Sequence, residues 1–114
     1  MNQEQTEFLY DKAMQVYGIK AQLHQLAEEC IELADEAMHT AKGTIGKENP
    51  VTAAQLFQEI VDVRIMCEQI ERYFGEGENG YMKDMMQNFR LDKLERLKFR
   101  LEKIEPLMKR LEKP

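Results

Sequence analysis

The amino-acid sequence predicts an all-α fold of four main helices. Three observations support this prediction. Glycine and proline occur at only a few positions, the runs between them are rich in strong helix formers, and the apolar residues recur at helical spacing without β-type alternation. A chain of 114 residues can bury one modest core and has no room for a second domain. We therefore expect one all-α domain over residues 1–114.

Gly18 separates the first two predicted helices. The first covers residues from about 5 to 17, and a glycine directly after it is a common helix end. The second covers about 19 to 42 and ends at Gly43. Its apolar residues follow the i, i+3, i+4, i+7 rule of an amphipathic helix: Ile19, Leu23, Leu26, Ala27, Cys30, Ile31, Ala34, Met38 and Ala41.

The third predicted helix follows a loop over residues 43–51. Thr52 and Gln55 form a capping box, and Val51 and Leu56 occupy the positions of a hydrophobic staple. These four residues predict a helix that begins at Thr52. We expect it to end at Gly75, before a second loop over residues 75–80.

The last predicted helix starts at about Tyr81. It carries a heptad seam with spacings of three and four residues: Leu94, Leu97, Leu101, Ile104, Met108 and Leu111. Pro106 interrupts this seam, so we expect a kink or a break near Glu105. The seam has two interpretations, part of the core of one chain or an oligomer interface, and self-association is the preferred one.

The composition excludes several classes of protein. A net charge of −5, from 16 basic and 21 acidic residues, argues against a nucleic-acid binder. No uncharged stretch approaches the roughly 20 apolar residues of a membrane span. The two cysteines, Cys30 and Cys67, make no disulfide framework, and we expect them to be small buried apolar residues. We expect a reduced, soluble, cytoplasmic protein.

Two acidic motifs stand inside the most apolar stretches of the second and third helices. Glu29 and Glu32 share a helix face because they are three residues apart, and so do Glu59 and Asp62. If the two helices pack antiparallel, the two pairs differ in level by only roughly 6 Å at about 1.5 Å per residue. The sequence therefore predicts that four carboxylates meet.

Such a cluster of carboxylates is unstable by itself. Each pair at about 4 Å repels by about 4 kcal/mol at an effective dielectric constant of about 20. Either some carboxyl groups carry raised pKa values or a divalent cation is bound. A set of oxygen ligands without paired histidines favours Mg²⁺, or Mn²⁺, over zinc.

These motifs give the chain a family resemblance. Glu28-Glu29-x-x-Glu32, followed after 26 residues by Glu59-x-x-Asp62, resembles the paired acidic signature of the all-α nucleoside triphosphate pyrophosphohydrolases, the MazG-like family. The resemblance covers about residues 17–100. It implies a four-helix MazG-like bundle that hydrolyses a nucleoside triphosphate to the monophosphate and pyrophosphate, in a house-cleaning role on deoxy- or non-standard nucleotides. It also implies assembly as a homodimer or homotetramer.

The resemblance also implies roles for individual residues. Glu29, Glu32, Glu59 and Asp62 would be ligands of Mg²⁺, which polarises the phosphates and helps to generate the attacking water. Glu28 would be either an additional ligand or a base outside the coordination sphere, and these two roles stay open.

Basic residues of the last helix are candidates for binding the triphosphate. Lys93 and Arg96 match the family pattern, and the heptad seam continued backwards from Leu97 adds Arg90 at an otherwise apolar position. For the base, the amide of Gln22 is a candidate, although a solvent-facing polar residue is the preferred interpretation of Gln22.

Two alternatives accompany this hypothesis. The acids could be ordinary charges on two solvated helix faces, and the protein a non-enzymatic helical interaction module that associates through the C-terminal seam. Glu36-x-x-His39 is half of a carboxylate di-iron box, but Ala21 stands where the other half would need an acid before His24, which argues against a di-iron site.

Overall fold

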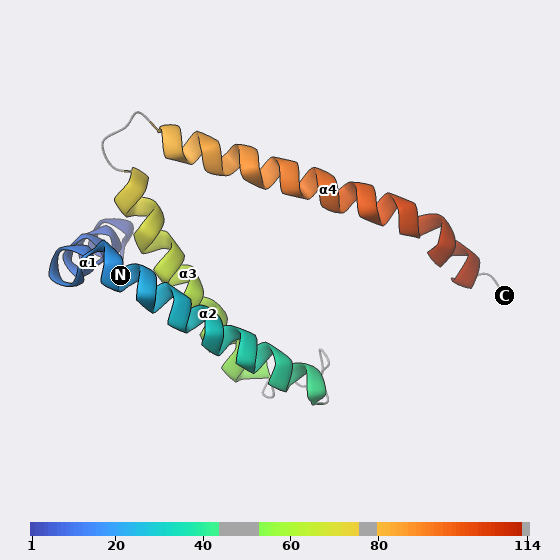
Figure 1. Ribbon diagram of the computed structural model, residues 1–114, viewed down its shortest axis with the longest axis horizontal. Coiled ribbons are helices and arrows are strands. Elements are labelled where there is room, and N and C mark those ends of the chain that lie inside the picture. Colours follow the sequence, from blue (N-terminus) through green and yellow to red (C-terminus); the bar gives the residue numbers. More distant parts are fainter. Residues whose placement is uncertain (44–52, 76–79, 113–114) are drawn as a thin grey trace. The chain divides into compact units, whose positions relative to one another are not determined.

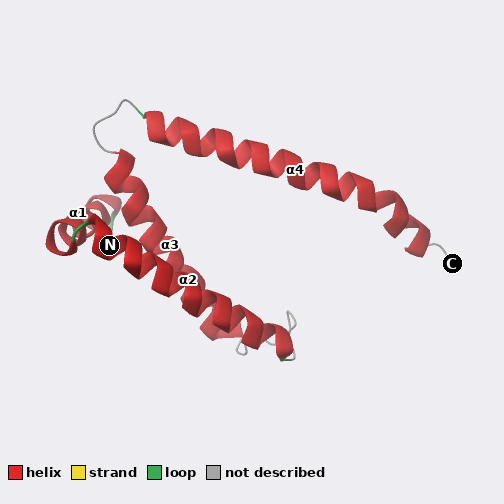
Figure 2. Ribbon diagram, viewed as in Figure 1, coloured by secondary structure: helices red, strands yellow, loops and turns green. Residues whose placement is uncertain are grey.

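The computed structural model describes residues 1–43, 53–75 and 80–112. It contains four helices and, within these ranges, no strand (Figures 1 and 2): α1 (Gln3–Tyr17), α2 (Ile19–Lys42), α3 (Ala54–Gly75) and α4 (Tyr81–Glu112). The predicted all-α fold with four helices is therefore confirmed. Among the described helices, none combines the length and the apolar character that crossing a bilayer requires.

The chain forms two units, residues 1–76 with helices α1 to α3 and residues 77–114 with helix α4. Each unit is considered by itself below. The first unit holds the acidic motifs, and the second holds the basic candidates and the heptad seam.

Helix α1 begins earlier than the sequence interpretation expected. Asn2 accepts a hydrogen bond from the backbone N–H of Gln5 at 2.8 Å, and the backbone N–H of Asn2 donates to the side chain of Gln5 at 2.9 Å. This reciprocal capping box satisfies two backbone donors that a helix start leaves free. The helix therefore starts at Gln3.

Gly18 ends α1 and begins α2. Its φ of 84° lies in the left-handed region, which glycine adopts without a steric cost. Its backbone N–H donates to the carbonyl of Met14 at 2.8 Å, and its carbonyl accepts from the N–H of Gln22 at 3.1 Å. A single residue therefore closes one helix and opens the next, and the chain turns sharply between them.

Helices α2 and α3 lie side by side and run antiparallel, and α1 packs against both (Figure 1). The α2 face that packs inside this unit is formed by buried or partly buried residues at spacings of three and four: Gln22, Leu26, Glu29, Leu33, Glu36 and Thr40. Four of these six residues are polar. The predicted amphipathic helix is present, but most of its apolar residues do not lie on its packed face.

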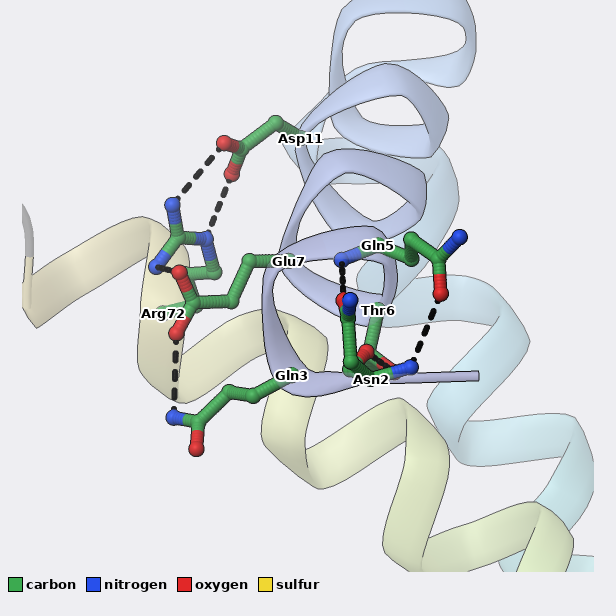
Figure 3. Close-up of polar contacts among 7 residues, drawn as sticks. All are labelled: Asn2, Gln3, Gln5, Thr6, Glu7, Asp11 and Arg72. Atoms are coloured by element: carbon green, nitrogen blue, oxygen red, sulfur yellow. Dashed lines mark hydrogen bonds and ion pairs between the residues drawn. The ribbon is translucent and has the colours of Figure 1, made fainter.

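A cluster of polar contacts holds α1 against the end of α3 (Figure 3). The guanidinium of Arg72 binds both carboxylate oxygens of Asp11, at 2.7 and 2.9 Å, and lies 3.4 Å from a carboxylate oxygen of Glu7. One helical turn earlier on α3, Glu68 accepts a hydrogen bond of 2.5 Å from the hydroxyl of Tyr10. Acidic side chains in this contact are therefore paired with donors from the chain itself.

A kink or a break was predicted near Glu105, and the break does not occur, because helix α4 continues through Pro106 to Glu112. A proline inside a helix removes one backbone hydrogen bond and its ring clashes with the carbonyl four residues earlier, a local cost of about 3 kcal/mol that the turns on both sides offset. The predicted capping residues Val51 and Thr52 lie outside the described residues. So do the side chains of Met108 and Leu111, the last two positions of the predicted seam.

Candidate metal centre

Three carboxylates meet across the α2–α3 pair. Glu29 of α2 and both Glu59 and Asp62 of α3 each present a carboxylate oxygen, and the three oxygens lie within 4.8 Å of one another. Glu29 and Glu59 are partly buried, and Asp62 is exposed at the surface. The two acidic motifs therefore meet at the level that antiparallel packing predicts.

The two glutamates are held in the same way. Gln25 donates a hydrogen bond from its side-chain amide to Oε1 of Glu29 at 2.9 Å, one turn along α2. Gln55 donates from its amide to Oε1 of Glu59 at 3.1 Å, one turn along α3. Each glutamine is therefore positioned to fix the rotamer of the glutamate that follows it, and neither glutamine was a sequence candidate. The sequence pattern that could have identified these glutamines is Gln-x-x-x-Glu, which occurs on both helices, because residues four apart on a helix have neighbouring side chains.

The second oxygen of each glutamate has no partner. Oε2 of Glu29 and Oε2 of Glu59 are both buried, and neither accepts a hydrogen bond. Among the described residues, no lysine, arginine or histidine forms an ion pair with either glutamate or with Asp62. Buried acceptors without partners are rare because each loses its hydration without replacement. Two charges 4.8 Å apart repel by about 3.5 kcal/mol at an effective dielectric constant of about 20.

Glu32 experiences the same negative charge. The carboxylate of Glu29, one turn away, raises the pKa of Glu32, with further contributions from burial and from the charges of Glu59 and Asp62. Glu32 is not one of the three residues with mutually close oxygens. It lies at the edge of the cluster as a fourth acid whose ionisation depends on the other three.

The geometry suits a hard divalent cation. Mg²⁺ binds oxygen ligands at about 2.1 Å, so two ligands of one ion are at most about 4.2 Å apart. Oxygens within 4.8 Å of one another reach that separation by side-chain rotations that move them by less than about 1 Å. The unpartnered oxygens of Glu29 and Glu59 are the atoms that such an ion would bind. Asp62, exposed on the same cluster, leaves a side open to solvent.

The other predicted residues of the first unit lie outside this cluster. Glu28 is exposed on α2 and is not among the three close carboxylates. Gln22 is buried, with 5% of its surface exposed, and its amide donates to the carbonyl of Ala13 at 3.5 Å. The solvent-facing interpretation of Gln22 was therefore wrong, because α1 covers this turn of α2. Contact between its amide and a nucleobase would require this hydrogen bond to break.

The basic candidates Lys93, Arg96 and Arg90 all lie exposed on α4, in the second unit. A guanidinium nitrogen of Arg96 lies 3.1 Å from a carboxylate oxygen of Asp92, one turn earlier, in an exposed pair. Exposed pairs of this kind contribute little and exchange readily with other partners. Binding of a triphosphate by these side chains stays a prediction.

The prediction for the cysteines was wrong in part. Both are free thiols, but Cys30 is exposed on α2 and only Cys67 is partly buried on α3. Burial, followed by the nearby charge of Glu71, raises the pKa of Cys67. Cys30 lies on the apolar side of α2 that the unit leaves uncovered, which its apolar flanks alone could not reveal.

Comparison of the chain with protein-family models, with curated proteins and with solved structures found no match. The geometry of the three carboxylates therefore carries the functional interpretation by itself.

Proposed function

We propose that this protein is a Mg²⁺-dependent nucleoside triphosphate pyrophosphohydrolase of the MazG-like type. The observation that supports the proposal is the meeting of Glu29, Glu59 and Asp62, with two buried oxygens that lack partners. Both acidic motifs of the family resemblance contribute to this meeting. A divalent ion would supply positive charge at a cluster of carboxylates that otherwise presents only negative charge to a triphosphate.

The chain's own residues have distinct parts in this proposal. Glu29, Glu59 and Asp62 hold the ion, with Glu32 at the edge of the set as a fourth ligand. Gln25 and Gln55 orient the two glutamates. A water attacks the α-phosphorus, the bond from that phosphorus to the bridging oxygen breaks, and pyrophosphate leaves. Glu28, as a base outside the coordination sphere, accepts the proton that the water gives up. Lys93, Arg96 and Arg90 are proposed to neutralise the triphosphate, in a cytoplasmic house-cleaning role.

The first test is pyrophosphate release from a panel of ribo- and deoxynucleoside triphosphates, with Mg²⁺, with Mn²⁺ and with a chelator. The proposal expects metal-dependent formation of monophosphate and pyrophosphate in equal amounts. Turnover in ¹⁸O-labelled water should place the label in the monophosphate, because attack occurs at the α-phosphorus. Formation of diphosphate and phosphate would contradict the assigned reaction.

Matched variants separate this activity from a contaminating phosphatase. Asp62→Asn and Glu59→Gln should each lower turnover by at least about 100-fold, since each removes a charged ligand. Asp35→Asn and Glu71→Gln change exposed acids on the same two helices and should retain turnover. Equal activity in both sets of variants would show that Glu59 and Asp62 are not part of the active site.

A second candidate function rests on a different observation. The apolar seam of α4 is about half exposed at Leu94, Leu97, Leu101 and Ile104, as expected of an interaction module. This alternative expects no metal dependence and no nucleotide binding. Leu97→Asp would abolish assembly and change no chemistry, whereas the pyrophosphohydrolase proposal expects a metal-dependent activity that Asp62→Asn removes.

A further inference from the structure

The two helices that meet at the acidic cluster carry the same local motif. Residues 25–32 of α2 and 55–62 of α3 both follow the pattern Gln-Leu-x-x-Glu-x-x-acid. Burial repeats with it, because in both copies the leucine and the first acid are partly buried while the glutamine and the last acid are exposed. The cluster is therefore assembled from two halves of the same design, one on each of two antiparallel helices.

In each half the glutamine occupies one oxygen of the glutamate and leaves the other oxygen free. The amide nitrogen of Gln25 lies 2.9 Å from Oε1 of Glu29, and that of Gln55 lies 3.1 Å from Oε1 of Glu59. Oε2 of each glutamate is buried and has no hydrogen-bond partner among the described residues. Each glutamate therefore offers a single oxygen to a cation for as long as its glutamine stays bound.

We propose that Gln25 and Gln55 make this site selective for Mg²⁺ over Ca²⁺, because they hold both glutamates in a form that binds through one oxygen. The inference rests on the proposed function, since it concerns the cation of that same site. Single oxygens from Glu29, Glu59 and Asp62 leave the other positions of an octahedral ion to water and phosphate. This division between carboxylates, water and phosphate is the one that Mg²⁺ prefers.

Ca²⁺ requires more oxygens from the same carboxylates. It takes about six to eight oxygen ligands at about 2.3–2.6 Å and often uses both oxygens of one carboxylate. In this site the second oxygen of each glutamate is the one that accepts a hydrogen bond from a glutamine. Binding through both oxygens therefore has to break hydrogen bonds to charged groups, whereas binding through Oε2 alone leaves them intact.

A purely local role for the glutamines predicts a different result. A glutamine four residues before an acid stabilises a helix to the same extent whatever cation is present. Its loss would lower the melting temperature in chelator and leave the relative affinity for the two ions unchanged. Loss of a glutamine that restricts a glutamate would weaken Mg²⁺ binding and strengthen Ca²⁺ binding. The ratio of the two dissociation constants therefore separates the two roles.

Isothermal titration calorimetry of the full chain, with Mg²⁺ and with Ca²⁺ in separate titrations, measures this ratio. The wild type should bind Mg²⁺ more tightly than Ca²⁺. In the double variant Gln25→Ala/Gln55→Ala, the ratio of the Ca²⁺ to the Mg²⁺ dissociation constant should fall at least about tenfold. Each single variant should show part of this change, with circular dichroism confirming unchanged helix content. A wild type that binds Ca²⁺ as tightly as Mg²⁺, or a double variant with the wild-type ratio, would overturn the proposal.

Two matched controls replace exposed neighbours of the glutamines. His24→Ala on α2 and Gln58→Ala on α3 remove side chains that form no part of the repeated motif, and both should keep the wild-type ratio. Infrared difference spectra add a direct readout of how the carboxylates bind. Ca²⁺ should lower the antisymmetric carboxylate stretch in the double variant, as binding through both oxygens does, and Mg²⁺ should not. The same lowering by Ca²⁺ in the wild type would contradict the proposal.

Failure of this proposal and failure of the proposed function give different results. A wild type that binds neither ion would remove the metal site and, with it, both proposals. Mg²⁺ binding and pyrophosphate release that Asp62→Asn abolishes, together with a wild-type ratio in the double variant, would keep the proposed function. That result would overturn the selectivity role of Gln25 and Gln55 alone.

Discussion

The first unit contains two contacts between helices that both gather acidic side chains, and they differ in how the charge is balanced. Where α1 meets α3, Glu7 and Asp11 surround the guanidinium of Arg72, and Glu68 accepts a hydrogen bond from Tyr10. Where α2 meets α3, Glu29, Glu59 and Asp62 approach one another without an ion pair. In the first contact every one of these acids has a cation or a hydrogen-bond donor from another helix, and in the second none has a cation.

This difference separates a structural role from a functional one. A bidentate arginine–carboxylate pair satisfies both partners and stabilises a helix contact. Carboxylates that are brought together without a cation reduce stability, and such an arrangement is typical of sites that bind an external cation. Changes at the α1–α3 contact should therefore affect folding alone, and changes at the α2–α3 contact should affect the response to Mg²⁺.

The largest expected effect is the loss of metal-induced stabilisation. Mg²⁺ at about 100 times its dissociation constant should stabilise the wild type by about 2.7 kcal/mol, a rise of several degrees in melting temperature. Asp62→Asn should abolish this rise because it removes a ligand charge, whereas Asp35→Asn should retain it. Thermal melts followed by circular dichroism, with Mg²⁺ and with chelator, measure both. An equal rise in the two variants would mean that the ion binds elsewhere.

The second-largest expected effect is a loss of stability at the α1–α3 contact. Arg72→Met should lower the free energy of unfolding by about 1–2 kcal/mol, because two acids lose a partly buried charged partner. Urea denaturation measures it, and Arg64→Met, an exposed arginine of the same helix, is the control. The Mg²⁺-induced rise in melting temperature should be the same as in the wild type. A smaller rise in Arg72→Met would show that the α1–α3 contact also affects Mg²⁺ binding, against the separation of roles proposed above.

Gln55→Ala should weaken Mg²⁺ binding by about tenfold, or about 1.4 kcal/mol, since Oε1 of Glu59 loses the donor that orients it. Isothermal titration calorimetry with Mg²⁺ measures this change. Gln58→Ala, at an exposed position of the same helix, is the matched control. A purely structural glutamine would lower the melting temperature in chelator and leave the dissociation constant for Mg²⁺ unchanged.

Tyr10→Phe should lower the free energy of unfolding by about 1 kcal/mol near neutral pH, the net contribution of a typical hydrogen bond. The hydrogen bond to Glu68, followed by burial and by the charge of that carboxylate, raises the pKa of Tyr10 to about 12. Because the folded protein holds this proton more tightly than the unfolded chain, the contribution is present below pH 10 and is lost between pH 10 and 12. The stability difference between wild type and variant should vanish across this window in urea denaturation. A difference that persists above pH 12 would contradict the assigned bond.

The smallest effect concerns Glu32, whose raised pKa means that its ionised form opposes folding. Glu32→Gln should therefore melt at a higher temperature than the wild type at neutral pH in chelator, and the difference should disappear as the pH falls below about 4.5. With Mg²⁺ the order should reverse, since the wild type gains a ligand. A variant that is less stable than the wild type in chelator would show that Glu32 is not repelled by the cluster.

Local features of the chain were the most predictable. Glycine at position 18, helix-forming runs and periodic apolar residues predicted the helices α1, α2 and α4 to within a few residues, because helix starts and ends depend on neighbouring residues. The level at which Glu29 meets Glu59 followed from the constant rise of an α-helix. Resemblance of the acidic motifs to a known family suggested the ligand set, and the structure brings together Glu29, Glu59 and Asp62 of it.

The rotation of α2 about its own axis was not predictable from periodicity alone. The apolar arc of this helix is wide enough to present more than one face, and only packing against α1 and α3 selects the face with Gln22 and Glu29. The exposure of Ile31 and the burial of Gln22 follow from that selection. The roles of Gln25 and Gln55 depended on the same packing, because it decides which oxygen of each glutamate lacks a partner.

The sequence by itself determined that the chain is all-α, where most of its helices begin and end, and which acids share a helix face. The tertiary structure decided which of those acids meet, which are paired with Arg72, and which apolar residues of α2 the packing of α1 and α3 leaves exposed. The physical reason is that helix formation depends on residues within about four positions, whereas charge balance and burial depend on side chains that only packing brings together.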